Sequence, residues 1–121
     1  MLNFIAKQME ALNIPYELGE WTSDVIPDRY FIGEPTFEPT TDEDGSYNNV
    51  MILTGTTRGK RIILDKDRRT IEKHFNPSCG LCAKTDSGSI AVFFKSAFYV
   101  PTGEADLKRI QINLDIKEWK G

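Results

Sequence analysis

Long apolar runs are missing from the sequence, and none approaches the roughly 18–20 residues that a membrane-spanning helix requires. Residues 1–6 have neither a basic region nor an extended apolar region, so we expect no secretory signal peptide and no membrane partner. An excess of basic residues is missing as well, because the formal net charge is −3. That balance argues against a general nucleic-acid-binding protein, and we expect no specific nucleic-acid partner.

Histidine and cysteine are scarce, with His74, Cys79 and Cys82 as their only representatives. The two cysteines have the Cys-x-x-Cys spacing of thiol-disulfide and zinc sites. A redox motif normally opens a helix, whereas this one follows an expected helix and opens an expected strand. A structural zinc site needs four ligands, and these residues supply three. The plain interpretation is a loop with two partly buried cysteines; the alternative is a metal or redox site at His74, Cys79 and Cys82.

The remaining composition is that of an ordinary folded protein, with 40% apolar and 27% charged residues in a chain of 121. This length corresponds to a single domain, residues 1–121. It is enough to bury roughly two-thirds of the unfolded surface around one core.

Charge is distributed unevenly along the chain. Residues 10–44 carry a net charge of −9, with Arg29 as their one basic residue, and residues 45–121 carry a net charge of +5. One interpretation is two solvated surfaces that fold back on each other. The other is self-association, because a head-to-tail contact joins two different patches and opposite charges favour it.

The N-terminal half predicts a short helix and a β-hairpin. A helical apolar period covers residues 2–12, and Pro15 prevents its continuation. Aromatic and β-branched residues predict strands at 29–37 and 47–57, joined by a polar, acidic turn at 38–46. The buried stripe expected for the helix consists of Leu2, Ile5, Ala6, Met9 and Leu12.

A second helix is predicted from Asp65, as the N-cap, to about Phe75. Asn76 and Pro77 would end it. The expected inward-facing residues are Arg68, Ile71 and Phe75, with Leu64 as a staple, and the expected outward or flanking residues are Asp67, Lys73 and His74.

The last forty residues predict a β-meander with strands at 81–85, 90–94 and 98–100, followed by a clear final strand. Its alternation predicts that Ile110, Ile112, Leu114 and Ile116 are buried and that Gln111, Asn113 and Asp115 are not. The expected fold class is α+β, with a mostly antiparallel twisted sheet and two short helices packed on one face.

The most basic region of the chain comprises Arg58, Lys60, Arg61, Arg68 and Arg69. Gly55, Gly59 and Lys60 do not have the spacing of a phosphate-binding loop. In order of preference, the region is a solvated face, a contact for the acidic turn of a neighbouring copy, or a contact for DNA phosphates. No nucleophile is paired with His74 by a known motif, so we expect no enzyme activity and no catalytic residue.

Several stretches resemble a group of small tail and head–tail-junction proteins of siphophages and prophages of Gram-positive hosts. In the N-terminal half they are Ile14-Pro-Tyr16-Glu and Pro27-Asp-Arg-Tyr-Phe-Ile-Gly-Glu34. In the C-terminal half they are Met51-Ile-Leu-Thr-Gly-Thr-Thr-Arg-Gly59, Ile71-Glu-Lys-His-Phe75, Pro101-Thr-Gly-Glu104, Leu107-Lys-Arg-Ile-Gln-Ile-Asn-Leu114 and Ile116-Lys-Glu-Trp119. Together they cover most of the chain, and none is a catalytic motif.

The size and element order are similar to tail-terminator and tail-completion proteins. This resemblance implies a virion structural protein that forms a ring, such as a hexamer, at the end of the tail. Its partners would be copies of itself, the tail tube protein and a head-completion or connector protein. It would have no cofactor, and it would be located in the virion, and in the host cytoplasm during assembly.

Two other functions remain open. One is a small thiol-redox or metal-binding protein that uses Cys79 and Cys82, and the other is a phage-encoded adaptor for a host protein. For a ring subunit, the expected interface residues are the acids Asp42, Glu43 and Asp44 on one copy and the bases Arg58, Lys60, Arg61, Arg68 and Arg69 on the next.

Overall fold

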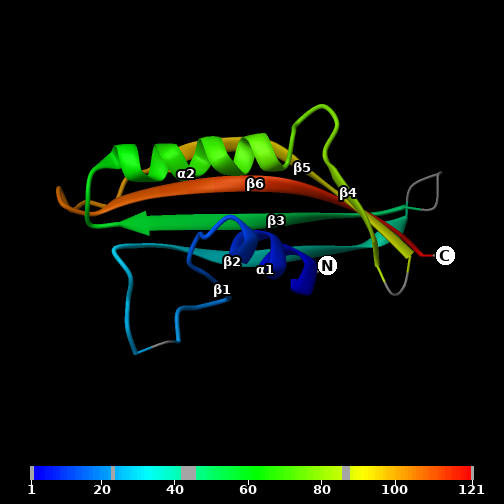
Figure 1. The fold of residues 1–121 in the computed structure, drawn as a ribbon, viewed down its shortest axis with the longest axis horizontal. Coiled ribbons are helices and arrows are strands. Elements are labelled where there is room, and N and C mark those ends of the chain that lie inside the picture. The colour runs from blue at the N-terminus through cyan, green and yellow to red at the C-terminus, as the bar shows by residue number, and fades with distance from the viewer. Residues whose placement is uncertain (1, 23, 42–45, 86–87, 121) are drawn as a thin grey trace.

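The computed structural model describes residues 2–22, 24–41, 46–85 and 88–120 (Figure 1). Two helices and six strands lie within these ranges. The helices are α1 (Leu2–Ala11) and α2 (Arg61–His74). The strands are β1 (Tyr16–Leu18), β2 (Arg29–Thr41), β3 (Ser46–Thr57), β4 (Leu81–Thr85), β5 (Gly88–Val100) and β6 (Lys108–Lys120).

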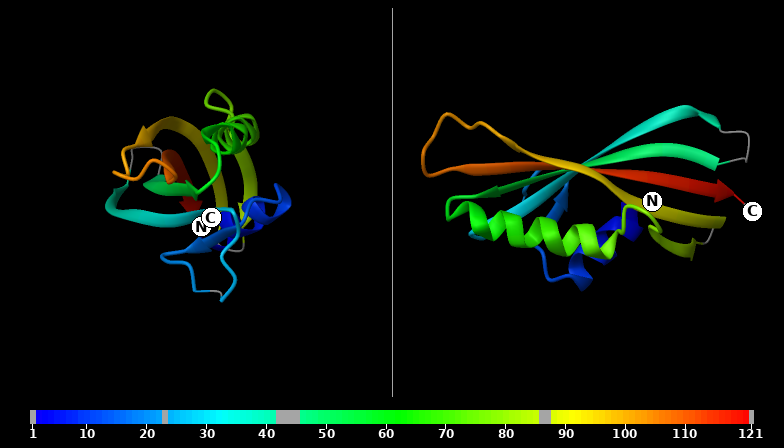
Figure 2. Two further views of the ribbon diagram at one scale, coloured as in Figure 1. Left: turned by 90° about the vertical axis from the view of Figure 1, so that its left-hand side faces the viewer. Right: turned by 90° about the horizontal axis from the view of Figure 1, so that it is seen from above.

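The strands form one sheet in the order β1-β2-β3-β6-β5-β4. All neighbours are antiparallel except β1 and β2, which are parallel. The predicted α+β class and mostly antiparallel sheet are therefore confirmed. A twisted sheet with both helices on one face is too simple a description, because the sheet is mixed and curls (Figure 2). As a result α1 lies against β1 at one edge, and α2 lies against β3, β5 and β6.

Strand β1 was not predicted as a separate element. It has three residues, and it pairs with β2 through the registers Tyr16–Phe31 and Leu18–Gly33. The Tyr16 ring occupies the space that a side chain at position 33 would need, so only glycine fits there. A three-residue strand that depends on a partner fifteen residues later leaves little periodic signal in the sequence.

The core follows the predicted alternation of the last strand. Ile110, Ile112, Leu114 and Ile116 of β6 are buried, while Gln111, Asn113 and Asp115 are partly exposed, so this prediction is confirmed. Strand β6 lies between β3 and β5, and its core residues face Leu53 and Met51 across the β3 pairing. Strand β3 is also interior, because it lies between β2 and β6.

Helix α1 has nearly the predicted length, but its buried face is rotated. Ile5 and Met9 are fully buried, whereas Ala6 is exposed, which contradicts its place in the predicted stripe. The buried face extends instead toward Phe4 and Gln8, both of which are half-buried. Gln8 contacts His74 across 2.7 Å, so this face of α1 reaches the end of α2.

Helix α2 starts earlier than predicted. It begins at Arg61 with Lys60 as its N-cap, and no side chain caps it. Asp65 is therefore not the N-cap; it lies in the second turn, where it pairs with Arg68 and Arg69. Asp67, expected to face outward, is buried.

The hairpin between the predicted strands 29–37 and 47–57 is confirmed by the pairing of β2 with β3. Strand β2 continues to Thr41, so residues 38–41 belong to the strand and not to the turn. Residues 42–45 of the predicted turn lie outside the described residues, as do residues 86 and 87 of the turn before β5. The predicted strands 90–94 and 98–100 are parts of one continuous strand, β5, with a register shift between Phe94 and Ser96.

Candidate functional site

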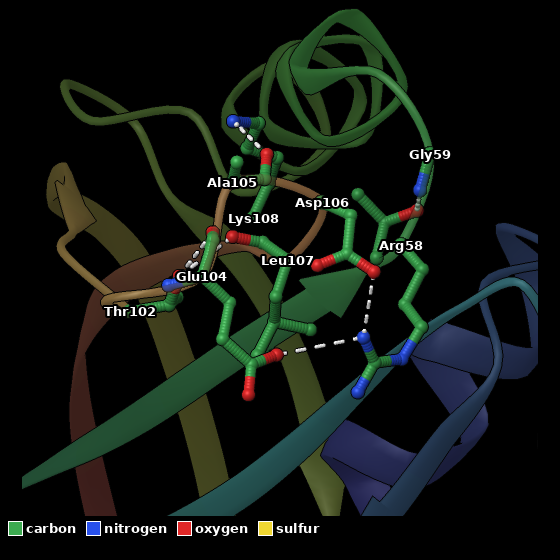
Figure 3. A network of polar contacts seen from close by, with 9 residues as sticks. Arg58, Gly59, Thr102, Glu104, Ala105, Asp106, Leu107 and Lys108 are labelled. Carbon is green, nitrogen blue, oxygen red and sulfur yellow. Dashed lines mark hydrogen bonds and ion pairs between the residues drawn. The ribbon is translucent and has the colours of Figure 1, made fainter.

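Arg58, the first of the predicted interface cations, has acidic partners on its own chain. Its guanidinium lies 3.1 Å from the Asp106 carboxylate and 3.5 Å from that of Glu104, in the loop between β5 and β6 (Figure 3). All three side chains are more than half exposed. Such ion pairs contribute little to the free energy of unfolding, and here they join the β5–β6 loop to the start of α2.

Arg68 and Arg69 are paired within α2. Arg68 contacts Asp65 at 3.0 Å and Glu72 at 2.9 Å, and Arg69 contacts Asp65 at 3.0 Å. The hydrogen bond to Asp65 is the main reason that the pKa of the Arg68 guanidinium is raised. These two predicted interface cations are thus partly neutralised by their own helix.

Arg61 borders a cleft at the end of β5. Its guanidinium carbon lies 4.5 Å from the centroid of the Tyr99 ring, a cation–π arrangement. Burial raises the pKa of the Tyr99 hydroxyl, so the phenol stays neutral around pH 7. The cleft has a volume of about 350 Å³, and we call it the basic cleft. Its other lining side chains are Val100, Pro101, Thr102, Glu104, Ala105, Leu107, Lys108 and Arg109, and Gly103 contributes backbone.

The loop that forms one wall of the basic cleft is held by its own polar groups (Figure 3). The Thr102 hydroxyl lies 2.8 Å from the carbonyl oxygen of Leu107 and accepts a hydrogen bond from the backbone N–H of Glu104 at 3.2 Å. The Lys108 ammonium donates to the carbonyl oxygen of Ala105 at 2.8 Å. The shape of the cleft is therefore set before anything binds to it.

A second surface is the loop between β1 and β2, which the structure describes at residues 19–22 and 24–28; we call these residues the 19–28 loop, and they project from the body of the molecule (Figure 1). The Trp21 indole N–H donates to the Val25 carbonyl oxygen at 3.1 Å, and the Trp21 ring packs on Tyr30 with centroids 5.3 Å apart. The Thr22 hydroxyl donates to the Glu17 carboxylate at 2.7 Å. These contacts fix the described parts of the loop to β1 and β2.

This 19–28 loop carries exposed apolar side chains. Val25 is 79% exposed and Ile26 is 67% exposed, and Leu18 at the end of β1 is also exposed. The sequence pattern did not predict this surface. The available signal was an apolar pair enclosed by Asp24 and Asp28, with no strand or helix period that would bury it.

A second cleft, of about 470 Å³, lies on the flank of the 19–28 loop. Leu107 and Arg109 line both this cleft and the basic cleft, so the two hollows are neighbours. The other lining residues are Ile26, Pro27, Asp28, Tyr30, Thr56, Thr57 and Arg58.

The alternative metal or redox residues do not converge. The His74 Nε2 atom contacts the Gln8 amide oxygen at 2.7 Å, and the ring lies edge-on to Phe75. Cys79 and Cys82 are both free thiols and both exposed, so the expectation of partly buried cysteines is wrong. Among the described residues, no three His, Cys, Asp or Glu side chains are placed to hold one metal ion.

A partly buried ion pair joins the first half of the chain to α2. The Arg29 Nε atom lies 2.7 Å from the Asp67 carboxylate, and Arg29 also donates to the Asn13 carbonyl oxygen at 3.2 Å. The Asp67 side chain is 8% exposed. Burial raises the pKa of the Asp67 carboxyl, and Arg29 opposes that shift without cancelling it. This pair explains why Asp67 faces inward.

The described ends of the β2–β3 hairpin lie far apart. Arg29 pairs with Thr57 at one end, next to Arg58, and Thr41 pairs with Tyr47 at the other, next to residues 42–45. Thirteen residues at about 3.3 Å each separate these ends by roughly 40 Å. Asp42, Glu43 and Asp44 themselves lie outside the described residues.

No family model and no curated protein matches the sequence in our comparisons. Within the described ranges, neither helix has both the length and the apolar character needed to cross a bilayer.

Proposed function

We propose that this chain is a structural subunit of a bacteriophage virion, a ring-forming tail-terminator or tail-completion protein at the head–tail junction. Its partners in this proposal are copies of itself, the tail tube protein and a head-completion or connector protein. Its place is the mature virion, which it reaches from the cytoplasm of the bacterial host. The resemblance of most of the sequence to such proteins is the starting point, and the surfaces of the molecule support it.

The observation that carries the proposal is the separation of unlike charge along the hairpin. Thr41, which directly precedes the acids at positions 42–44 in the sequence, and Thr57, which directly precedes Arg58, lie at opposite ends of a hairpin roughly 40 Å long. The screening length near physiological salt is about 8–10 Å, so attraction between charges at the two ends of the hairpin is screened within one copy. Contacts between unlike ends of successive copies are heterologous, and they generate a ring when the rotation between copies closes.

The two clefts are also suited to recognition by side chains. The walls of both combine arginine with leucine, proline and tyrosine, and the basic cleft adds Lys108. Apolar side chains supply contact area, and charges at the rim favour one partner and one orientation. Both properties are expected of a subunit that assembles with defined neighbours.

The proposal is tested genetically in a phage that carries this gene. Deletion of the gene should leave heads and tails that do not join, and expression of the protein from a plasmid should restore joined particles. Joined, infectious particles in the absence of the protein would contradict the proposed function.

We expect self-association of the purified protein to weaken with added salt, because attraction between charged rims is screened. Replacement of Asp42, Glu43 and Asp44 by serine should weaken association at low salt and reduce its dependence on salt. The free energy of unfolding should stay within about 0.5 kcal/mol of the unchanged protein. Light scattering across a salt series, with the triple variant in parallel, is the measurement. Equal association of both proteins at every salt concentration would show that these acids only solubilise the surface.

A second candidate, a small thiol-redox or metal-binding protein, is favoured by one observation: both thiols of the Cys-x-x-Cys segment are exposed. The backbone N–H of Cys79 is held by the Asn76 side chain at 3.0 Å, so the segment is ordered. Exposure and order are compatible with reaction or metal binding at Cys79 and Cys82.

We nevertheless expect Cys79→Ser, Cys82→Ser protein to fold and associate like the unchanged protein. The cysteines are exposed and outside the core, so their loss removes no packing. Circular dichroism and light scattering check the fold and the association, and metal analysis is done on the unchanged protein. Stoichiometric zinc, or unfolding by a chelator, would overturn this expectation and favour the metal-binding candidate.

A further inference from the structure

The 19–28 loop presents apolar surface to solvent although it is well anchored. Val25 and Ile26 are more exposed than the other large apolar side chains of the described structure, apart from Ile62 at 69%. The Trp21–Val25 hydrogen bond and the Thr22–Glu17 contacts hold the backbone that carries them. Exposed, adjacent apolar side chains are typical of a contact surface. Because this loop is already ordered, little conformational entropy is lost when it binds a partner.

Acidic residues surround this apolar tip. Glu20, Asp24 and Asp28 are all exposed, and the described part of the loop contains no basic residue. The tip therefore presents two aliphatic side chains, Val25 and Ile26, flanked by negatively charged side chains.

The basic cleft has the complementary chemistry. Three bases, Arg61, Lys108 and Arg109, stand at its walls against one acid, Glu104, which is already near Arg58. Its apolar walls come from Tyr99, Val100, Pro101 and Leu107. A volume of about 350 Å³ has room for the aliphatic side chains of the tip.

We propose that the 19–28 loop of one copy docks into the basic cleft of a second copy, with Val25 and Ile26 inserted and Asp24 facing Arg61 or Arg109. This inference rests on the proposed function and specifies the subunit contact that the ring requires. The contact is heterologous, because the inserted loop and the receiving cleft are different surfaces of the same chain.

A contact of two loops with each other is disfavoured, since both tips are acidic and like charges repel. End-on, the 19–28 loop and the loop of residues 101–107 project to different sides of the molecule (Figure 2, left). Each copy can therefore offer its loop to one neighbour and its cleft to another.

Strand addition at the β2 edge is also disfavoured. The Phe31 N–H donates to the Pro15 carbonyl oxygen at 2.8 Å, on the side of β2 away from β3. Because the backbone groups of a strand alternate in direction, those of residues 33 and 35 point to the same side as those of Phe31. Beyond β1, the next such residue is Pro35, which has no N–H to donate. Proline at an open edge hinders the pairing of a further strand.

The first test replaces both Val25 and Ile26 by serine. Sedimentation equilibrium should show association weakened by at least about tenfold, because the apolar anchor of the contact is lost. Ile62→Ser is the matched control: Ile62 is equally exposed but lies on α2, outside both surfaces, and its replacement should leave association unchanged. The Asp42, Glu43, Asp44 serine variant controls for charge at the other end of the hairpin.

The second test is a cysteine cross-link in the Cys79→Ser, Cys82→Ser background. Ile26→Cys chains and Ala105→Cys chains are oxidised separately and then as a mixture; Ala105 lines the basic cleft, and its replacement keeps the backbone carbonyl that Lys108 contacts. The mixture should give a disulfide-linked dimer of the two variants, and neither variant alone should give one. A dimer from Ile26→Cys chains alone would show a loop-to-loop contact and overturn the inference.

The remaining outcomes separate this inference from the proposed function. The docking contact is overturned if the Val25, Ile26 variant associates as strongly as the Ile62 control. It is also overturned if that variant weakens association less than the Asp42–Asp44 variant does. Neither result contradicts the proposed ring subunit. Protein that stays monomeric at every concentration overturns the docking contact as well. If the phage without this gene still makes joined heads and tails, the proposed function is overturned, whatever the interface between copies.

Discussion

Arg29→Ala should lower the free energy of unfolding by about 3 kcal/mol near pH 7. Removal of one partner of a buried ion pair leaves the other charge without compensation, at a cost of roughly 3–5 kcal/mol. Asp67 is 8% exposed, whereas Arg29 is 32% exposed, so we place the effect at the lower end of that range. The Asn13 carbonyl oxygen also loses its contact with Arg29. Urea denaturation of the variant and the unchanged protein measures the difference.

The loss should shrink as the pH falls. The pKa of the Asp67 carboxyl is already raised by burial in the folded protein, and removal of Arg29 takes away the main group that lowers it, leaving only the weaker effect of Lys66. The folded state then binds a proton more tightly than the unfolded state. Stability from this group is complete below the unfolded pKa of about 4 and is lost as the pH rises through the folded value. The Arg29→Ala protein should therefore regain stability, relative to the unchanged protein, as the pH is lowered toward about 4.

Arg58→Ala is the matched control. Arg58 also has two polar partners, but its side chain is 65% exposed, so its loss should cost no more than about 0.5 kcal/mol. The Arg29→Ala, Asp67→Asn double variant should be more stable near pH 7 than Arg29→Ala alone, because it contains no unpaired buried charge. Equal losses for Arg29→Ala and Arg58→Ala, or a loss that does not change with pH, would show that the pair is not effectively buried.

Ile112→Ala should lower the free energy of unfolding by about 2–4 kcal/mol, the range for truncation of a core isoleucine. The Ile112 side chain is fully buried at the middle of β6, between Leu53 of β3 and Ala97 of β5. Strands on both sides limit how far the core can collapse into the space that the truncation leaves.

Gln111→Ala tests the same strand on its other face. Gln111 is partly exposed, and its replacement should change stability by no more than about 0.5 kcal/mol. A loss below about 1 kcal/mol for Ile112→Ala, or similar losses for both variants, would contradict the register of β6 in the core.

Features with a strong local period could be predicted from the sequence. The alternation from Ile110 to Ile116 determined which face of β6 is buried, and β-branched residues on either side of an acidic turn determined the β2–β3 hairpin. In each case one face is apolar and the other polar, so a shift by one residue would expose the apolar set.

Features that depend on distant partners could not be predicted. Asp67 has the position of an outward-facing helical residue, and it is buried because Arg29 reaches it from 38 residues away. Asp65 is of a residue type that often caps helices, but the N-cap is Lys60, five residues earlier, and no side chain caps the helix. An N-cap side chain stabilises a helix by only about 1 kcal/mol. Packing of the turn that precedes Asp65 is enough to extend the helix past it.

The candidate contact surfaces were also only partly predictable. The basic residues were identified from composition, but their separation into paired and cleft-lining groups depends on Asp65, Glu104 and Asp106, whose positions follow from the fold. The exposure of Val25 and Ile26 results from the anchoring of their loop through Trp21 and Thr22. Composition alone does not distinguish such a loop from a buried apolar segment.

Cryo-electron microscopy of the phage particle tests the account most directly. We predict a closed ring of copies of this chain at the end of the tail that meets the head, with the 19–28 loop of each copy in the basic cleft of the next. Purified particles that contain no copies of the chain, or copies that do not contact one another, would contradict the account.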